Sequence, residues 1–357
     1  MRIIAIHLLN DYSGSPKVLM QLLKGWSKKN IETHLYTCSG REGFLPNVDQ
    51  VKNHFYWYRF AKKPYLRLLF LITSQFLLAV QLLIKLQKKD IVYINTIFPF
   101  GAAIAGKIRG CKVMYHIHET TMKSKILKLF LFRIVKITAS EVVYVSHFSA
   151  NQEPLNVKKN VIYNILESSF IKQSRLNFNT KKQSKIVLMI CSLKACKGIN
   201  EFLKLAQINP IFTFKLVVNA SQNEINAYFE KENIPSNLII YPTQKDTHPF
   251  YKEASVVLNL SDTNLWVETF GLTILEVMVY GLPTIVPPIG GGVIELVEEG
   301  KNGYLIDCKN IALISEELNT QLLNSTLYSQ VNESTLAYRK YFCEDYFENE
   351  SIRILSN

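Results

Sequence analysis

The chain has 357 residues, of which 48% are hydrophobic and 20% are charged. This composition excludes a disordered, collagen-like or low-complexity chain, and the length favours two domains of about 150 to 180 residues each. The net charge of +12 is uneven, because residues 1–170 hold 24 Lys/Arg against 9 Asp/Glu (+15), whereas residues 171–357 hold 17 against 20 (−3). A basic half-chain indicates an acidic partner, either nucleic acid or an anionic membrane surface, or else a solvated basic face.

The N-terminal apolar run, residues 3–9, is short, contains a His and ends in a polar turn. This pattern predicts a buried strand and not a signal peptide. The six cysteines are scattered, with no C-x-x-C pair and no His at zinc-ligand spacing, which indicates reduced thiols without a disulfide framework or zinc site. We therefore expect a cytoplasmic protein.

Short apolar, β-branched runs alternate with helical patterns along the chain. Continuously apolar runs between helices are typical of a parallel sheet covered on both faces. The pattern predicts an α/β protein with two Rossmann-like, doubly wound domains. The predicted strands are residues 3–9, 31–37, 90–96, 111–118, 141–146, 185–191, 212–219, 237–242, 255–260 and 283–287.

A polar, basic stretch without apolar periodicity, residues 167–185, separates the two series of strands and is the natural linker. We place the N-terminal domain at residues 1–170, the linker at 171–184 and the C-terminal domain at 185–333. Residues 334–357 are predicted to form a helix that can pack against either domain, including back against the N-terminal one.

Ligands of open α/β sheets bind beyond the carboxyl ends of the strands. After the first strand, Gly14 and Ser15 precede a helix that has Pro16 near its start, so free backbone N–H groups would suit an anion there. The same residue types are also common in any strand-to-helix turn.

The densest pattern runs from residue 266 to residue 303. Glu268 lies before an apolar helix that opens at Gly271 and Leu272, and Glu276 lies in its second turn. The helix N-terminus offers N–H donors to phosphate, and the two carboxylates suit sugar and ribose hydroxyls. Glu residues in helices are usually solvated, but unpaired burial in such an apolar stretch would cost several kcal/mol. This cost favours a functional role for Glu268 and Glu276.

These residues resemble the retaining, GT-B-fold glycosyltransferases of family 4. The similarity covers nearly the whole chain and is dense from 190 to 307. The motifs that carry it are Glu268 to Glu276 (E-x7-E), Gly281-Leu282-Pro283, Glu295-Leu296-Val297, Asn302-Gly303, Lys197-Gly198, and Ser146 with Asn164.

The resemblance implies roles for particular residues. Glu276 would bind the ribose and Glu268 the transferred sugar, while Lys197 and the 271–272 amides would bind the diphosphate. His118 matches the family's His near the anomeric centre, so His118 and Glu268 are the predicted catalytic residues. Lys197 can alternatively begin an exposed helix, and His118 can be a core histidine beside His116. The predicted substrate-binding residues are Gly14, Ser15, Lys197, Phe270, Gly271, Leu272 and Glu276.

The chain departs from the family at one point. The family commonly has Gly-Arg where this sequence has Cys191-Ser192, which removes one cation from the diphosphate site. Lys194, two residues further on, can compensate.

Two apolar segments of the basic half bear on a membrane partner. Residues 66–86 hold 15 apolar side chains of 21 and no charge from 68 to 84, which is long enough for a membrane span. A polar stripe, with Gln75 beside it, favours instead a helix buried on three sides and wet on the fourth. The stripe consists of Arg67, Ser74, Gln81, Lys85 and Lys88.

The second segment, residues 122–137, places a basic arc on one helix face together with Leu129 and Phe132. Such a face suits anionic lipid, unless those two side chains pack on a neighbour. Nucleic acid is disfavoured, since no binding module accompanies the charge. The basic arc consists of Lys125, Lys128, Arg133 and Lys136.

We therefore interpret the chain as a retaining glycosyltransferase of the hexosyltransferase type, located peripherally at the inner face of the cell membrane. It would transfer sugar from a nucleotide-diphosphate sugar to a lipid-linked or polysaccharide acceptor in bacterial surface glycan synthesis. No D-x-D motif occurs, so we expect no metal and no other cofactor. A sugar-nucleotide epimerase of related fold and an inactive glycosyltransferase-like binding partner remain alternatives.

Overall fold

The structure, a computed structural model, describes residues 1–46, 48–119, 122, 124–176, 185–320, 331 and 342–356. The chain divides into two compact units. The N-terminal unit comprises residues 1–164 together with 345–357, and the C-terminal unit comprises residues 165–344.

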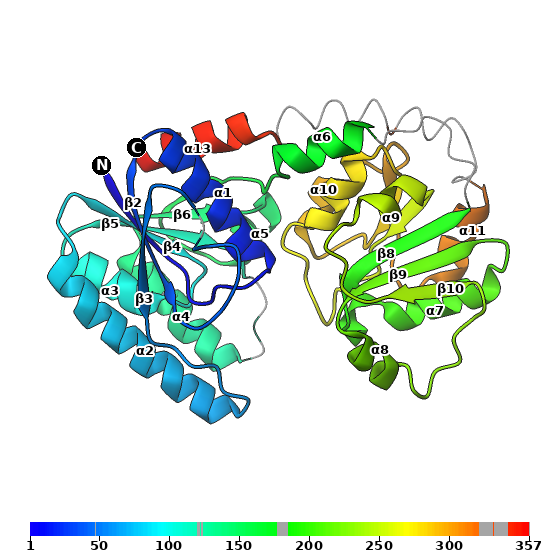
Figure 1. Cartoon of the computed structure of the whole chain (residues 1–357), viewed down its shortest axis with the longest axis horizontal. Coiled ribbons are helices and arrows are strands. Elements are labelled where there is room, and N and C mark those ends of the chain that lie inside the picture. Colours follow the sequence, from blue (N-terminus) through cyan, green and yellow to red (C-terminus); the bar gives the residue numbers. More distant parts are fainter. Residues whose placement is uncertain are drawn as a thin grey trace. The chain divides into compact units, whose positions relative to one another are not determined.

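The N-terminal unit is built on a parallel sheet with the strand order β3-β2-β1-β4-β5-β6-β7 (Figure 1). Five of these strands coincide with predicted apolar runs. The edge strands β3 and β7 were not predicted, because most of their side chains are at least partly exposed and break the apolar pattern. The bounds are β1 (Arg2–Ile6), β2 (Glu32–Cys38), β3 (Val51–Tyr56), β4 (Asp90–Asn95), β5 (Lys112–Ile117), β6 (Glu141–Tyr144) and β7 (Lys158–Val161).

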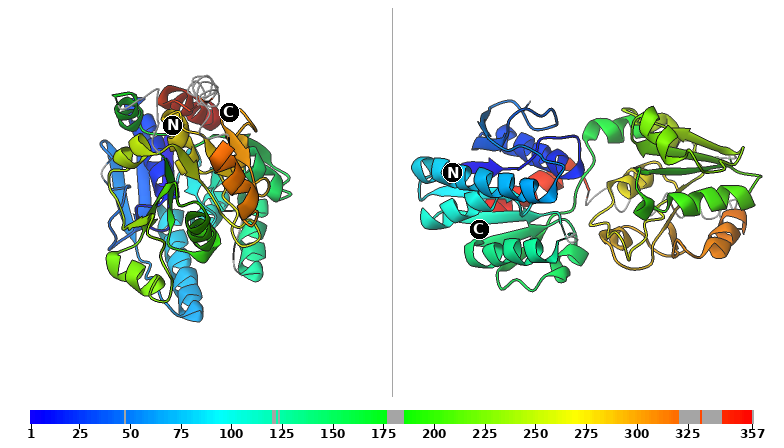
Figure 2. Two further views of the ribbon diagram at one scale, coloured as in Figure 1. Left: turned by 90° about the vertical axis from the view of Figure 1, so that its right-hand side faces the viewer. Right: turned by 90° about the horizontal axis from the view of Figure 1, so that it is seen from below.

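Helices cover both faces of this sheet. On one face α1 (Gly14–Lys28) lies beside α13 (Glu344–Ser356), and on the other α2 (Pro64–Lys85), α3 (Phe100–Ile108) and α4 (Lys125–Thr138) form a layer (Figures 1 and 2). A short helix, α5 (His147–Gln152), follows β6. The predicted doubly wound arrangement is therefore found in this unit.

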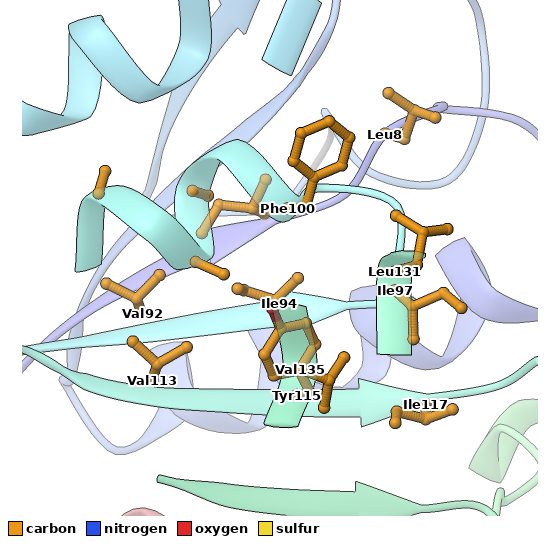
Figure 3. Close-up of a cluster of buried hydrophobic side chains, with 14 of the residues drawn as sticks. Leu8, Val92, Ile94, Ile97, Phe100, Val113, Tyr115, Ile117, Leu131 and Val135 are labelled. Atoms are coloured by element: carbon orange, nitrogen blue, oxygen red, sulfur yellow. The ribbon is translucent and has the colours of Figure 1, made fainter. Parts of the chain in front are cut away.

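A core cluster of the N-terminal unit lies between the sheet and the α2–α4 layer. Ile94 and Tyr115 from adjacent strands are buried against Phe100 of α3 and against Leu131 and Val135 of α4 (Figure 3). Burial of this apolar surface drives the packing and fixes where β4 and β5 end. Their carboxyl ends carry the polar residues described below.

The C-terminal unit has a second parallel sheet, with the order β10-β9-β8-β11-β12-β13. The helices α7, α8 and α11 contribute to the hydrophobic core on one face, and α6, α9 and α10 pack together on the other (Figure 1). The strands are β8 (Ile186–Ser192), β9 (Thr213–Asn219), β10 (Leu238–Tyr241), β11 (Val256–Leu258), β12 (Thr284–Val286) and β13 (Gly303–Leu305). The helices are α6 (Ser168–Leu176), η1 (Ala195–Lys197), α7 (Ile199–Ile208), α8 (Gln222–Tyr228), α9 (His248–Glu253), α10 (Leu272–Val279), η2 (Gly292–Glu295) and α11 (Ile311–Thr320).

The segment predicted as the linker, residues 171–184, is helical at its start. Residues 171–176 complete α6, whose Phe170 packs on His248 and Tyr251 of α9, and this apolar contact explains why the polar stretch does not begin as a free linker. Residues 177–184 lie outside the described residues, as do 334–341 of the predicted C-terminal segment.

The helix predicted near the end of the chain packs on the N-terminal unit. The indole Nε1 of Trp26 in α1 donates to Ser351 Oγ at 3.2 Å, and Lys28 pairs with Glu348 at 2.6 Å. Lys112 Nζ also donates to the backbone oxygen of Ile354. The N-terminal unit is thus completed by residues that follow the C-terminal unit in the chain.

The orientation of α2 differs from the prediction of a wet polar stripe. Ser74 and Gln75 are fully buried, and Gln75 Oε1 accepts a hydrogen bond from the backbone N–H of Gly101 at 3.1 Å. The amides that begin a helix need acceptors, so α3 requires a polar side chain on the inner face of α2. The predicted stripe is therefore wrong at Ser74. The predicted burial on three sides is wrong as well, because Leu71, Leu78 and Leu82 are buried in the core while a second apolar face of α2 is exposed.

The basic arc of α4 is also only partly as predicted. Leu129 is exposed, whereas Phe132 is buried in the core. Lys128 pairs with Glu153 at 2.5 Å, and Lys125, Arg133 and Lys136 are exposed. The two apolar members of the arc thus have different roles.

Candidate active site

The loops after β8 and β11 meet at the carboxyl edge of the second sheet, because these two strands are neighbours. The strand order reverses at β8, which is flanked by β9 and β11, and such a switch point is where open α/β sheets bind ligands. The backbone N–H of Asp262, after β11, donates to the carbonyl of Cys196, after β8, at 2.9 Å. This bond ties the two loops together.

Two glycines at this edge hold left-handed backbone conformations. Gly198, with φ +76°, ends η1 against the backbone of Leu260, and Gly271, with φ +88°, opens α10. A Cβ atom at Gly271 would lie 2.5 Å from a methyl group of Val293. Other residues are strained in this conformation, so glycine is required where each helix begins.

Lys197 and Glu268, predicted to bind different parts of a donor, are partners in the structure. Lys197 Nζ donates to Glu268 Oε2 at 2.5 Å, and both side chains are partly buried. The backbone carbonyl of Glu268 accepts from the N–H of Gly292 at 2.8 Å, which fixes the loop against η2. The pair places a cation and a carboxylate directly beside the start of α10.

Trp266 lies beside both lysines of this edge. The ammonium groups of Lys194 and Lys197 are each 5.3 Å from the centre of its ring, within the range of cation–π attraction. The indole Nε1 of Trp266 is buried and has no hydrogen-bond partner among the residues that the structure describes. Lys194 is therefore placed to act at the same site as Lys197, and Trp266 is a candidate that the sequence did not single out.

Glu276 lies in the second turn of α10 and is held by a tyrosine. The hydroxyl of Tyr251, in α9, donates to Glu276 Oε2 at 2.6 Å. Burial, with the adjacent carboxylate, raises the pKa of Tyr251 well above its usual value, so Tyr251 remains a donor at neutral pH. Nothing in the sequence near Tyr251, 25 residues before Glu276, indicated this role.

The remaining predicted residues of this unit contribute through the backbone. Phe270 is buried, with its ring 6.2 Å from that of Phe342, so its side chain belongs to the core and leaves only its backbone to contact a substrate. Gly271 is the residue before α10, and Leu272 is the first residue within it. Their amides lie where a helix attracts anions.

The N-terminal unit joins Ser15 and His118 through a residue that the sequence did not single out, and Gly14, predicted to precede the helix, is the first residue of α1. Asn95, the last residue of β4, is fully buried. Its Nδ2 donates to the backbone carbonyl of Ser15 at 3.0 Å, and its Oδ1 lies 2.9 Å from His118 Nε2. His7 Nδ1 is also 3.0 Å from Asn95 Nδ2.

This arrangement fixes the proton on His118. A carbonyl accepts only, so the atom of Asn95 that faces Ser15 must be the amide nitrogen, and the one that faces His118 must be the oxygen. His118 therefore carries hydrogen on Nε2 and a lone pair on Nδ1. Burial and the neighbouring His116 and His7 hold the pKa of His118 well below its usual range, which keeps it neutral at pH 7.

The alternative that His118 is a core histidine describes its neighbour His116 better than it describes His118. His116 is fully buried, and its Nδ1 lies 3.0 Å from the hydroxyl of Tyr93. His118 is partly exposed at the end of β5. Of the two histidines, His116 is the core residue and His118 is accessible.

Comparison with known proteins gives two adjoining family matches. Residues 12–164 match the model described as Glycosyltransferase Family 4, and residues 171–336 match that described as Glycosyl transferases group 1. An uncharacterized glycosyltransferase of Haemophilus influenzae is 27% identical over 171 residues, which are 46% of each chain. The present chain thus spans about half the length of that curated relative.

Solved structures resemble the whole chain. Anabaena HepE in complex with UDP and glucose superposes with a TM-score of 0.76 at 19% identity, with 100% of both chains covered. The lipopolysaccharide outer core galactosyltransferase WaaB gives a TM-score of 0.71 at 17% identity, with 100% of this chain and 99% of WaaB covered. These likenesses show the fold.

The chain has the fold of the GT-B glycosyltransferases, with two parallel-sheet units and a candidate sugar-nucleotide site at the switch point of the second sheet. The chain carries a Glycosyltransferase Family 4 domain over residues 12–164 and a Glycosyl transferases group 1 domain over residues 171–336, in the order of its two units. The predicted family, fold and enzyme class are thereby confirmed.

Proposed function

We propose that this protein transfers a sugar from a nucleotide-diphosphate sugar to a lipid-linked or polysaccharide acceptor of a bacterial surface glycan, with retention at the anomeric carbon. The observation that carries the proposal is the cluster at the β8–β11 edge. Lys197 and Glu268 lie beside the N-terminus of α10, and Glu276 follows one turn later. This set offers a cation, helix amides and two carboxylates to the three polar parts of a sugar nucleotide.

In the proposed complex, the ammonium group of Lys197 and the first amides of α10 neutralise the diphosphate. Glu276, oriented by Tyr251, accepts hydrogen bonds from the ribose hydroxyls, and Glu268 binds the transferred sugar. HepE has been crystallised with UDP and glucose, which supports a UDP-sugar as the first donor to test. The predicted independence of metal rests on Lys197 and these amides replacing a cation at the leaving group.

The transfer itself breaks the bond between the anomeric carbon and the diphosphate oxygen. The electron pair leaves with the diphosphate, and a hydroxyl of the acceptor bonds the same face of that carbon while its proton passes to the departing diphosphate. His118, neutral and held by Asn95, is proposed to orient the sugar near the anomeric centre. Electrostatic stabilisation of the leaving group is the main contribution expected of the protein.

The charge of the N-terminal half supports the proposed acceptor and location. The excess of Lys and Arg in residues 1–170 suits an anionic acceptor or bilayer surface, so we place the protein in the cytoplasm, peripherally at the inner face of the membrane. WaaB, named as a lipopolysaccharide outer core galactosyltransferase, shares this fold and supports a lipid-linked acceptor.

A panel of sugar nucleotides, each incubated with and without a membrane-lipid extract as acceptor, tests the proposal. Release of nucleoside diphosphate that depends on the acceptor, with sugar found on lipid or glycan, is the expected result. A changed sugar on an intact nucleotide would instead make the protein an epimerase. Binding without turnover of any donor would make it an inactive partner.

A further inference from the structure

The outward face of α2 is apolar over the length of a long helix. By length and composition α2 is able to cross a membrane, yet only 28% of its most apolar 18-residue stretch is buried. Phe76 is 66% exposed and Ile84 is 81% exposed. The other large apolar side chains exposed on this helix are Tyr65, Leu68, Leu69, Ile72, Leu77 and Val80. Contiguous apolar surface of this kind on a folded protein marks an interaction site.

Aromatic and basic residues surround the start of this face. Trp57 and Phe60, just before α2, are both exposed, and the Trp57 ring lies 5.6 Å from that of Phe70. The guanidinium of Arg67 lies 4.3 Å from the centre of the Phe60 ring. Arg59, Lys62 and Lys63 are exposed around them. Aromatic side chains with basic neighbours are typical of helices that lie at a bilayer interface.

The next helices extend the same surface. α2 packs on α3 and α3 on α4, so the three form one layer whose outer side is seen in the right-hand view of Figure 2. On α4, Ile126 is 83% exposed and Leu129 is 72% exposed, among the exposed Lys125 and Arg133. The helices α2, α3 and α4, as described, contain no Asp or Glu.

The charge of the surrounding sequence is equally one-sided. Residues 51–140 contain 16 Lys and Arg but only two acidic residues, Asp90 and Glu119. Asp90 is buried and paired with Arg2, so it does not reduce the positive charge of the outer surface. An apolar face within a mainly basic surround is complementary to lipid tails beneath anionic headgroups.

We propose that the outer surface of the α2–α4 layer lies on a bilayer that contains anionic lipid, with the exposed apolar side chains of α2 inserted among the headgroups. The inference rests on the membrane location proposed above and assigns it to α2 as well as to the basic arc of α4. A spanning arrangement would remove Gln75 from the amide of Gly101, whereas a helix that lies on the surface keeps this bond. Apolar contact is not screened by salt, so attachment through α2 is partly salt-resistant.

Flotation with vesicles of phosphatidylcholine plus phosphatidylglycerol, and with phosphatidylcholine alone, tests the inference. The variant Leu69→Gln, Ile72→Gln, Phe76→Gln changes only exposed side chains of α2. The matched control Ile208→Gln, Ile211→Gln, Ile239→Gln changes three exposed apolar side chains of the C-terminal unit. Thermal unfolding and calorimetric affinity for UDP verify that both variants remain folded.

We expect the wild type to bind the anionic vesicles and to retain part of its binding in about 1 M NaCl. The α2 variant should bind at least about tenfold less, because three apolar side chains no longer enter the bilayer, and the control should bind within about twofold of the wild type. Trp57→Phe should remove the blue shift of tryptophan fluorescence that accompanies binding.

Three results would overturn the inference. Equal vesicle binding by the α2 variant and the wild type would show that α2 does not enter the bilayer. Retention of the protein on membranes through alkaline carbonate would indicate a span. Oligomers that the α2 variant abolishes, without any vesicle binding, would indicate a protein interface. Acceptor-dependent transfer in detergent is measured without vesicles. The transferase proposal is therefore tested independently of vesicle binding.

Discussion

Replacing Glu276 separates the binding of the nucleotide from the stability of the fold. The carboxylate has about four acceptor positions, and Tyr251 occupies one of them in the structure. Hydrogen bonds to a charged group contribute about 1.5 to 3 kcal/mol, so Glu276→Ala should weaken binding of the bare nucleoside diphosphate by about 1 to 3 kcal/mol. This is about fivefold to somewhat over a hundredfold in Kd.

The same change removes an acceptor from the buried hydroxyl of Tyr251, which should lower the free energy of unfolding by about 1 to 3 kcal/mol. Glu276→Gln keeps an acceptor for Tyr251 but removes the charge. It should therefore lose affinity for the nucleotide while it unfolds nearly as the wild type does. Isothermal titration calorimetry and denaturant unfolding on the same samples measure the two effects.

Glu268→Ala is the control for the division of roles. Because Glu268 pairs with Lys197, its removal frees the ammonium group, so the affinity for bare nucleoside diphosphate should be unchanged or tighter while turnover falls. Equal affinity in wild type and Glu276→Ala would show that the nucleotide binds elsewhere. A loss of affinity in Glu268→Ala as large as in Glu276→Ala would refute the separate roles.

Four further predictions concern the charges of the site and of the N-terminal unit. Lys197→Ala should reduce turnover about 10²-fold or more, whereas EDTA should leave activity largely intact; abolition by EDTA with rescue by Mg²⁺ or Mn²⁺ would contradict this. Lys194→Ala should raise KM for the donor. Adding Ser192→Arg should return KM toward the wild-type value, because that position carries the family's arginine. An unchanged KM in the double variant would place Lys194 outside the diphosphate site. Asn95→Asp should raise the pKa of His118, because a carboxylate favours the imidazolium. The acidic limb of the pH–rate profile should then move upward by about 1 to 3 pH units. An unmoved limb would show that the protonation of His118 does not control the rate. Burial lowers the pKa of His7 to about 4 and of His116 to about 3, so their stabilisation is complete above pH 6.5 and is lost as the pH falls toward these values. Urea titrations between pH 6 and 4.5 should accordingly show that the free energy of unfolding changes with pH by about 1.2 kcal/mol per pH unit less in His7→Leu than in the wild type; parallel curves would refute this.

Apolar periodicity correctly predicted the strands whose side chains are buried on both faces of the sheet. The run that became β4 is apolar on both faces because helices cover both, and such a run has few alternative structures. The edge strand β7 (Lys158–Val161) is half exposed and has no such signal. The face of α2 was misjudged because Gln75 is required as an acceptor for Gly101, and a helical wheel contains no information about a neighbouring helix end.

The candidate site shows the same limit. Lys197, Glu268 and Glu276 were recognisable because their spacing matches a family motif around a helix start. Asn95 and Tyr251 act through contacts across the fold, to His118 and to Glu276, and each is 23 to 25 residues from its partner in the chain. Their roles are set by strand order and by packing between helices, which the local sequence does not encode.

The docking of α13 on α1 has a consequence for biosynthesis. During translation Trp26 is synthesised early, but its hydrogen-bond partner Ser351 is synthesised only after the 180 residues from 165 to 344 have been added. At about 5 to 20 residues per second this interval lasts roughly 10 to 40 seconds. During that time one side of the first sheet is covered by α1 without α13, while the C-terminal unit emerges from the ribosome. Chaperone capture should therefore favour the N-terminal unit, although it is translated first.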